Sequence, residues 1–590
     1  MLDKDIEDKA AAKEKAARER QRTERAAAKQ KEAAQKQRRR NRAMVAIAKA
    51  NQKMSVKFAA VVLSSSTLVS ALLGIYRDRL LNSMYLDTYK VGIDAYTVAF
   101  TVPDFMYQIL VSGALAVTFI PVFNSRMAKN NHESAWQMSS SLMNLLAIIT
   151  LVASVLIMIF APWLVKYIVG PGLSESGQQL ATSMMRVIAI NPFLFSIATV
   201  LTSIQQAVGR FVLNAMAPIL YNLGIIIGAK YFTGGISIFG HQIFGGGIMG
   251  VALGVVLGAI LQLIISSLGQ IGMGMDYNFK IFWKNRGFKK ILTLLPARSI
   301  DQSLDYISSS IVDTNLASRM ADGTIRAYQQ ASTLYNMPVN LIGISIATAA
   351  FPDMTKEIGA GNKKKFIEQM QSAMRLIIWF AMPVAVMMFF CRGYVVSVID
   401  RGGNQVIADL LGVFCLAIFF RSVFHILSRS FYAFQDTKTP LWVSAITLGI
   451  TVIIEVWFVL GLHTGPTGIA WAQVIWAILE IVSLMILILR KVPNLFDRTF
   501  WRGIGKMTLC SFLMGIVTYT LVRINGLQFH NQNMIMVLIP LCAIGLISVA
   551  VYVGLSKLFK VEEADPFIAQ VKQMLGKIWN VINGQFMIQK

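Results

Sequence analysis

The chain has 590 residues, of which 55% are hydrophobic and only 15% are charged. A soluble chain carries about 25% charged residues, so this composition argues against a soluble multidomain enzyme. Many apolar runs approach or exceed the roughly 20 residues that a helix needs to cross a bilayer. We therefore predict an all-α, polytopic membrane protein and exclude a membrane β-barrel, whose strands alternate apolar and polar residues.

The formal net charge is +25, from 56 Lys and Arg against 31 Asp and Glu. Residues 1–53 hold seventeen Lys or Arg and eight Asp or Glu, a surplus of nine, and most other basic residues fall in short loops between apolar runs. This distribution favours an anionic membrane surface over nucleic acid. We predict a basic cytoplasmic tail at 1–55, with RNA binding as the weaker alternative.

About fourteen membrane-spanning helices follow the tail, by the hydropathy rule. In chain order, their predicted ranges are 56–80, 92–120, 138–166, 180–204, 211–230, 246–270, 290–316, 325–351, 372–392, 405–428, 440–461, 467–489, 504–523 and 533–555.

The orientation follows from Lys and Arg in the loops, which are enriched in every second loop along the chain. The basic loops are marked by Lys280, Lys284 and Arg286, by Lys363, Lys364 and Lys365, and by Arg490, Lys491, Arg498 and Arg502. An even number of spans then places both termini in the cytoplasm. The last segment, 556–590, has an amphipathic pattern and is predicted to lie on the membrane surface.

A weak internal repeat divides the spans. The predicted second helix carries Pro103 and ends at Pro121, and the predicted eighth carries Pro338 and ends at Pro352. Six helices between the copies indicate parallel repeats. The predicted architecture is therefore two six-helix lobes around a central cavity, at 56–270 and 290–490, followed by two extra helices at 504–555.

Charges inside spans usually face a cavity or one another, because burying them in lipid is costly. Arg77 and Asp94 lie on consecutive predicted helices. They could form an anion-binding group at the outer part of a cavity. Equally, they could form a structural ion pair that closes the helix hairpin.

A second group of polar residues could bind a hard cation. Asp301 and Asp305 are four residues apart and share one helix face, and Asp313 lies two turns further on nearly the same face. Together with Thr451 and Glu455 they supply the oxygen ligands that suit Na⁺ or a proton relay. The alternative is a salt bridge with Arg298 or Arg421.

Neither the cysteines nor other motifs indicate catalysis. The four cysteines form no CxxC pair and the five histidines are scattered, so no metal site is expected. There is also no Walker A sequence.

Several segments resemble the MurJ (MviN) lipid II flippase family, of the multidrug/oligosaccharidyl-lipid/polysaccharide exporter superfamily. The similar segments are Gly74-Ile75-Tyr76-Arg77-Asp78, Asp94-Ala95-Tyr96, Val102-Pro103-Asp104-Phe105, Phe119-Ile120-Pro121-Val122-Phe123, Met337-Pro338-Val339-Asn340, Ala349-Ala350-Phe351-Pro352 and the run from Phe431 to Pro440. The resemblance covers about 56–555 and omits the basic tail.

The resemblance implies a transporter, not an enzyme, that flips the undecaprenyl-diphosphate-linked peptidoglycan precursor across the bacterial plasma membrane by alternating access, for cell wall synthesis. It implies a cationic cavity for the diphosphate, a lipid-tail groove by the last two helices, coupling to Na⁺, protons or the membrane potential, and no bound cofactor. A monomer is expected.

This chain lacks several charges that the family commonly carries. The positions at which they are replaced are Ala71, Tyr107, Ser112, Ser332, Thr333 and Asn336. Arg326 and Arg186 are the candidates to supply the missing charge, so the expected substrate-binding residues are Arg77, Asp94, Arg326 and Arg186. Two alternatives stay open: export of another undecaprenyl-diphosphate-linked saccharide, such as a teichoic acid or polysaccharide precursor, and a membrane scaffold that transports nothing.

Overall fold

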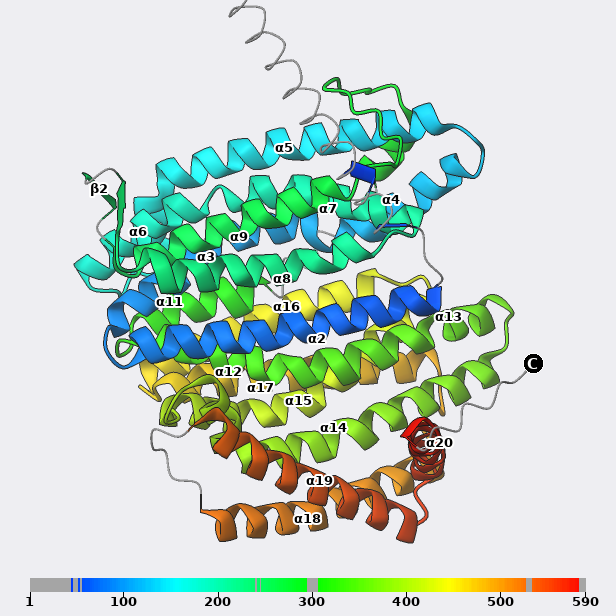
Figure 1. Ribbon diagram of the computed structural model, residues 1–590. Coiled ribbons are helices and arrows are strands. Elements are labelled where there is room, and N and C mark those ends of the chain that lie inside the picture. The colour runs from blue at the N-terminus through cyan, green and yellow to red at the C-terminus, as the bar shows by residue number, and fades with distance from the viewer. Residues whose placement is uncertain are drawn as a thin grey trace, which may run out of the picture.

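The computed structural model describes residues 56–238, 241–244, 246–293, 306–526 and 533–582, together with 44–45 and 51–52. It is a bundle of long, roughly parallel helices (Figure 1). The first group of α-helices is α2 (Val56–Leu81), α3 (Lys90–Tyr107), α4 (Gly113–Met127), α5 (His132–Trp163), α6 (Glu175–Ile188), α7 (Asn191–Val208), α8 (Val212–Ile227) and α9 (Met249–Leu268). A short antiparallel hairpin, β1 (Ile236–Ile238) and β2 (His241–Phe244), joins α8 to α9.

The second group is α11 (Asp313–Ser318), α12 (Thr324–Pro338), α13 (Ser345–Gly359), α14 (Lys363–Ile399), α15 (Gln405–Ala433), α16 (Lys438–Val456) and α17 (Pro466–Lys491). The chain continues with α18 (Arg498–Asn525), α19 (Met534–Leu558) and α20 (Ala564–Ile582). Seven π-helical segments interrupt or extend the described α-helices: η1 (Asn82–Leu86), η2 (Gln108–Ser112), η3 (Leu164–Val169), η4 (Gly228–Phe232), η5 (Ile307–Val312), η6 (Val339–Ile344) and η7 (Trp457–Gly461).

The helical membrane fold is confirmed. Within the described ranges, eleven helices are long and apolar enough to cross a membrane. Helical segments also occupy the remaining predicted ranges, although part of 290–316 lies outside the described residues. The number of fourteen crossings itself stays a prediction.

The helices α2 to α9 pack mainly against one another, and so do η5 to α17; we call these two groups the N-lobe and the C-lobe. Figure 1 shows α2 running between the two lobes. The helices α18 and α19 lie against α14, on the side opposite to α15. The helix α20 is seen end-on there, so it lies across the bundle. Its start is tied to α14 through Arg375, which bonds to Glu563 at 2.5 Å, and through an edge-to-face contact between the rings of Trp379 and Phe567.

Side-chain caps explain where several of these helices begin. Asn131, Asn362, Asn404 and Asp497 each precede a long helix and accept a hydrogen bond from a backbone N–H three residues on. Such caps satisfy donors that the first helical turn leaves unpaired. The connecting loops at these points are therefore short, and consecutive helices run antiparallel.

Two interior prolines were wrongly predicted to end their helices. The helix α4 continues past Pro121 to Met127, and α13 continues past Pro352 to Gly359. A proline removes one helical hydrogen bond, which neighbouring helices in a membrane bundle help to compensate. The two repeats nevertheless share a plan, since α3 passes through η2 into α4 just as α12 passes through η6 into α13.

Glycines allow α8 and α9 to approach closely. A Cβ atom on Gly224 would lie 2.3 Å from the Cα atom of Gly258, and one on Gly254 would lie 2.6 Å from that of Gly228. Contact between backbones compensates for the lack of a hydrophobic driving force between helices in lipid. Larger side chains at these glycines would push α8 and α9 apart.

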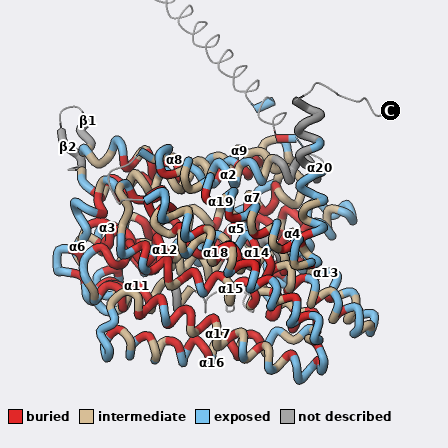
Figure 2. The backbone as a smooth tube through the Cα atoms, turned by 90° about the horizontal axis from the view of Figure 1, so that it is seen from below, coloured by how far each residue is buried: buried red, intermediate tan, exposed pale blue. Residues whose placement is uncertain are grey.

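Buried residues run through the middle of the bundle, and exposed ones lie on the outward sides of the peripheral helices (Figure 2). On α5 the exposed side is apolar, as Ile148, Val152 and Ile159 illustrate. Exposed Trp and Tyr side chains gather toward the two ends of the bundle, as expected at membrane interfaces. They are Trp163, Tyr167, Tyr231 and Trp457 toward one end, and Trp283, Trp442 and Trp501 toward the other.

We call the end where α2 ends and α3 begins the far end, and the opposite one the near end. The main pairs of elements that pack across the lobe boundary are α3 with α12, α2 with α14, η5 with α3 and η3, and α11 with η3. Their contacts lie toward the far end. The described lobes are therefore joined at the far end.

Candidate functional site

Two arginines from different lobes meet around one carboxylate at the far end. Arg77 of α2 donates from Nη2 to Oδ1 of Asp78 at 3.0 Å, and Arg326 of α12 donates from Nη2 to the same oxygen at 3.3 Å. Arg77 also donates to Asn222 at 2.9 Å, and Arg326 donates to Asn82 at 3.0 Å. The site therefore carries two guanidinium groups against one anion, with neutral amides fixing both cations in place.

Asp94 takes a different partner from the one predicted. Its carboxylate accepts hydrogen bonds from the backbone N–H groups of Gly323, at 2.6 Å, and Arg326, at 2.9 Å. The ion pair between Asp94 and Arg77, one of the two alternatives left open by the sequence, is not formed, because Asp94 faces the start of α12 whereas Arg77 pairs with Asp78. A carboxylate is stabilised there by the positive end of the helix dipole.

In a second contact between the lobes, the N-lobe supplies a cation and the C-lobe supplies carbonyl oxygens. Arg79 donates to the carbonyl oxygens of Ser397, at 2.6 Å, and Val398, at 2.9 Å, while Asn82 donates to that of Ile399 at 3.1 Å. These carbonyls end α14, where a helix carries partial negative charge. The N-lobe thus caps the start of one C-lobe helix with an anion and the end of another with a cation.

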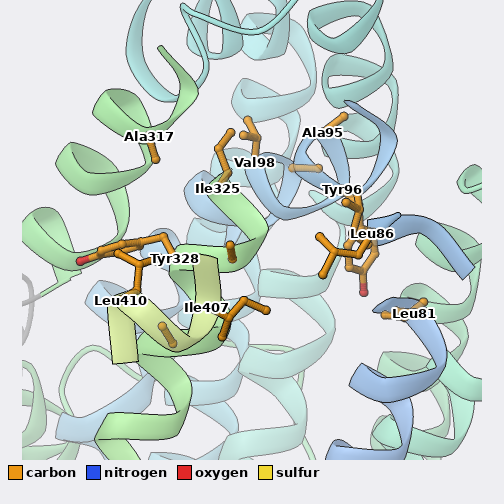
Figure 3. Close-up of a cluster of buried hydrophobic side chains, with 14 of the residues drawn as sticks. Leu81, Leu86, Ala95, Tyr96, Val98, Ala317, Ile325, Tyr328, Ile407 and Leu410 are labelled. Atoms are coloured by element: carbon orange, nitrogen blue, oxygen red, sulfur yellow. The ribbon is translucent and has the colours of Figure 1, made fainter. Parts of the chain in front are cut away.

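Apolar side chains surround these polar contacts. Figure 3 shows Leu81 and Leu86 from the end of α2 and η1, Tyr96 from α3, and Ile325 from α12 in one cluster. All four are buried. Excluding water strengthens the hydrogen bonds and ion pairs beside them, because the local dielectric constant is lower.

Closure of the far end is expected to depend on pH through Asp400, which follows α14 and is buried. Burial raises the pKa of its carboxyl to about 6, with a further increase from the charge of Asp87, whereas Arg326 and Arg79 lower it. A raised pKa means that the protonated form favours the closed state, so closure should be strongest below about pH 4 and weaken as the pH rises through about 6. For a cysteine placed at Ser397, the ratio of the thiol-labelling rate at about pH 8 to that at about pH 5 should be larger in the parent chain than in an Asp400→Asn variant, because the comparison cancels the higher thiolate fraction at pH 8. An Asp400→Asn variant whose labelling keeps the same pH dependence would contradict this assignment.

Arg186 lies outside this group. Its side chain is exposed on α6 and donates from Nε to the carbonyl oxygen of Met158 at 3.1 Å. Pro162 lies four residues after Met158 and has no N–H, so that carbonyl lacks its usual helical partner. Arg186 satisfies the carbonyl and does not join Arg77 and Arg326, contrary to the expected grouping.

The candidate cation site is built around Asp313 at the start of α11. Gln473 of α17 donates to both carboxylate oxygens at 3.1 Å, and the hydroxyl of Tyr328 donates to Oδ2. Glu455 of α16 lies beside it, within reach of a hydrogen bond between the two carboxyls. Thr451 lies one turn before Glu455, and all these side chains are buried.

Two buried carboxylates side by side repel each other unless a proton or a cation lies between them. The Glu455 oxygens and the Thr451 hydroxyl have no hydrogen-bond partner within hydrogen-bonding geometry among the described residues. This set of oxygen donors fits a hard monovalent cation or a shared proton. Asp301 and Asp305 lie outside the described residues. The described parts of the chain contain no cluster of three or more His, Cys, Asp or Glu residues suited to a metal.

Sequence reasoning missed the residues that hold these groups in place. Asp78, Asn82, Asn222 and Gln473 are the partners of the predicted site residues, yet none of them was predicted as a site residue, and the last three are neutral. A search for amide side chains within the predicted spans would have found Asn222 and Gln473, whereas Asn82 lies just after the first predicted span. Nothing local in the sequence indicates which arginine Asp78 would contact.

Two of the substituted positions are Tyr107, at the end of α3, and Thr333, on α12. Tyr107 bonds to Thr199 at 3.0 Å and packs on Phe195, so an aromatic ring occupies that part of the N-lobe interior. Thr333 is exposed on α12, and its hydroxyl bonds only to the preceding turn of its own helix among the described contacts. Of the predicted substrate-binding arginines, Arg77 and Arg326 are the two that the structure brings together.

The fold and this site define a class, a two-lobed helical membrane transporter in which charged groups meet where the lobes join. The profile described as "Lipid II flippase MurJ" matches residues 89–539, so the chain belongs to that family. It is a multi-pass inner-membrane protein and a transporter, not an enzyme, as predicted from the resemblance.

Individual relatives agree with this membership. The chain is 24% identical over 511 residues to a probable lipid II flippase MurJ of Thermotoga maritima, covering 86% of this chain and 97% of the relative. It is 24% identical over 414 residues to the lipid II flippase MurJ of Burkholderia cenocepacia, covering 68% of this chain and 77% of the relative.

Solved structures share the fold. A lipid II flippase MurJ in an inward closed conformation has a TM-score of 0.65 at 22% identity, over 85% of this chain and 98% of that one. An inward-facing multidrug resistance MATE family transporter of the MOP superfamily has a TM-score of 0.57 at 17% identity, over 74% of this chain and all of that one.

Proposed function

We propose that this protein flips lipid II from the inner to the outer leaflet by alternating access, as a monomer with both termini in the cytoplasm. The observation that carries the proposal is the pair of guanidinium groups, from Arg77 and Arg326, that converge from two lobes on Asp78. A diphosphate can replace the single carboxylate between them, because guanidinium groups bind phosphate through two parallel hydrogen bonds.

The same contacts supply the conformational change. In the closed far end, Asp78, Asp94 and Arg79 hold the lobes together. A ligand that engages Arg77 and Arg326 weakens their contact with Asp78 and so favours the open far end. A ligand shifts such an equilibrium only by its difference in affinity for the two states.

We further propose that a monovalent cation or a proton couples to this cycle in the C-lobe. Asp313, Thr451 and Glu455 would hold a cation, with Gln473 and Tyr328 orienting the first carboxylate. A bound cation would supply positive charge that allows both carboxyls to stay ionised. Asp313 begins the short helix α11, and the loop after α11 leads to Gly323, so the group is close in sequence to the α12 start that Asp94 caps.

Complementation tests the proposal. When the endogenous flippase is depleted, this chain should support growth, and Arg77→Ala should reduce flipping at least about a hundredfold while the protein stays in the membrane. The matched control is Arg186→Ala, which removes an arginine outside the site and should retain activity. Lipid II exposure at the outer leaflet is the measurement. Growth of the Arg77 variant at the wild-type rate would overturn the role of this arginine.

The alternatives predict different results. Export of another undecaprenyl-diphosphate-linked saccharide predicts no rescue of lipid II exposure, with Arg77 still required for export of that substrate. If the protein is a scaffold that transports nothing, replacing Arg77 or Arg326 should not change the transport of any substrate.

A further inference from the structure

A cavity of about 450 Å³ lies away from the site where the lobes meet. Its walls come from the far ends of α14 and α18 and from the start of α15. It contains two arginines, Arg392 and Arg523, set among aromatic and apolar side chains that include Phe390, Tyr519 and Val522. None of the residues assigned above to transport or cation binding lines it.

Both guanidinium groups are held in position. Arg392 donates from Nη1 to the carbonyl oxygen of Phe389 at 2.7 Å and lies 4.8 Å from the centre of that ring. Arg523 donates from Nε to the hydroxyl of Tyr519 at 3.0 Å and lies 5.5 Å from its ring centre. The rings orient the cations through their negative faces but carry no net charge.

The described part of the chain supplies no ion-pair partner for the positive charge in the cavity. Among the described residues, no carboxylate forms an ion pair with Arg392 or Arg523. Gln405, which also lines the cavity, donates its amide N–H to Asp409 at 2.8 Å, and this carboxylate keeps its charge but forms no ion pair with either arginine. Gln405 is also the first residue of α15, whose helix dipole adds partial positive charge at this wall.

The depth of the cavity indicates the kind of anion. Arg392 lies seven residues before the end of α14, and Arg523 lies two before the end of α18. Exposed aromatic residues such as Trp163 and Trp457 stand at similar distances from the far ends of their own helices. This is the level at which lipid headgroups meet the hydrocarbon.

We propose that this cavity binds the phosphate of an anionic lipid headgroup, with the acyl chains lying along the apolar sides of α14 and α18. The two guanidinium groups bind the phosphate, and Phe390, Tyr519 and Val522 contact the upper part of the chains. The binding is independent of the proposed transport activity. Only the choice of leaflet, the outer one, rests on the proposed orientation.

Lipid binding to the purified full-length protein in detergent tests this proposal. Native mass spectrometry should detect one phosphatidylglycerol that binds at least about tenfold more tightly than phosphatidylcholine, since the net anionic headgroup lacks a competing cation. Arg523→Gln should weaken that binding about tenfold, and the double variant Arg392→Gln, Arg523→Gln should abolish it. Arg401→Gln, which removes an exposed far-end arginine outside the cavity, should bind as the wild type does.

Two controls separate the possible failures. Arg392 packs over Gly412, so the double variant must show the wild-type melting temperature in lipid-free detergent. If the double variant is unfolded, the single Arg523 variant decides, because that side chain is exposed. Wild-type phosphatidylglycerol affinity in the folded variants would overturn the proposal. Displacement of the lipid by inorganic phosphate at equal concentration would show a site for free phosphate and overturn the lipid assignment.

Discussion

Replacing Asp94 by alanine should leave the far end unsealed and abolish transport. The carboxylate is buried and accepts two backbone N–H groups at the start of α12. Without it, both donors are unpaired in the closed state, at a cost of roughly 1–3 kcal/mol each. A combined shift of this size changes the ratio of closed to open protein by about thirtyfold or more.

Labelling and growth measure this effect together. A cysteine at Ser397, in a chain whose four native cysteines are replaced, should react with a membrane-impermeant thiol reagent much faster in the Asp94→Ala background, while growth by complementation is lost. Asp94→Asn keeps one acceptor oxygen and should be intermediate. Asp409→Ala, an exposed far-end carboxylate bonded only to Gln405 among its described contacts, serves as the control. Slow labelling in the Asp94→Ala chain would show that other contacts alone seal this end.

The sequence identified Asp94 as important but not its partner. Composition and hydropathy predict helices well, because each apolar run reports locally on the lipid around it. The partner of Asp94 is set by how α3 meets α12, 229 residues later in the chain at Gly323. No periodicity records that contact, and a charge on a neighbouring helix was the nearest available choice.

For Arg186 as well, the sequence marks a charge within a helix but does not reveal what it contacts. An arginine in an apolar run suggests a cavity. In the structure, Arg186 compensates for a carbonyl that Pro162 leaves without a helical donor on another helix. Sequence therefore reveals that a charge has a purpose within the membrane, while the packing of helices decides whether that purpose is substrate binding or structure.

At the far end, one helix start of the C-lobe is capped by an anion and one helix end by a cation. These two caps explain how the contact between the lobes can be both strong and reversible. Asp94 binds the positive start of α12, and Arg79 binds the negative end of α14. Each cap satisfies backbone groups that water could satisfy equally well once the end opens. Opening therefore leaves few unpaired groups, which suits a structure that alternates between two states.

Glu455→Gln should remove the dependence of transport on the coupling cation while preserving the fold. In the parent chain, two buried carboxyls lie together, and the Glu455 oxygens and the Thr451 hydroxyl accept no hydrogen bond from the described residues. The amide abolishes the repulsion, and Asp313 keeps its bonds from Gln473 and Tyr328. We expect the apparent affinity for Na⁺, measured as stimulation of flipping in vesicles, to fall at least about tenfold, because one of two anionic ligands is lost.

A proton in place of Na⁺ would give a different pattern, in which the pH profile of flipping flattens in the variant and Na⁺ has no effect on either protein. The matched control is Glu480→Gln on α17, since that carboxylate pairs with Arg421 at 2.8 Å and accepts a bond from Ser444. Its loss should reduce the melting temperature but leave the ion response of the folded protein unchanged. If Glu455→Gln kept the parent response to both Na⁺ and pH, the paired carboxyls would have a structural role only, since neutralising one of them must alter any cation or proton held between them.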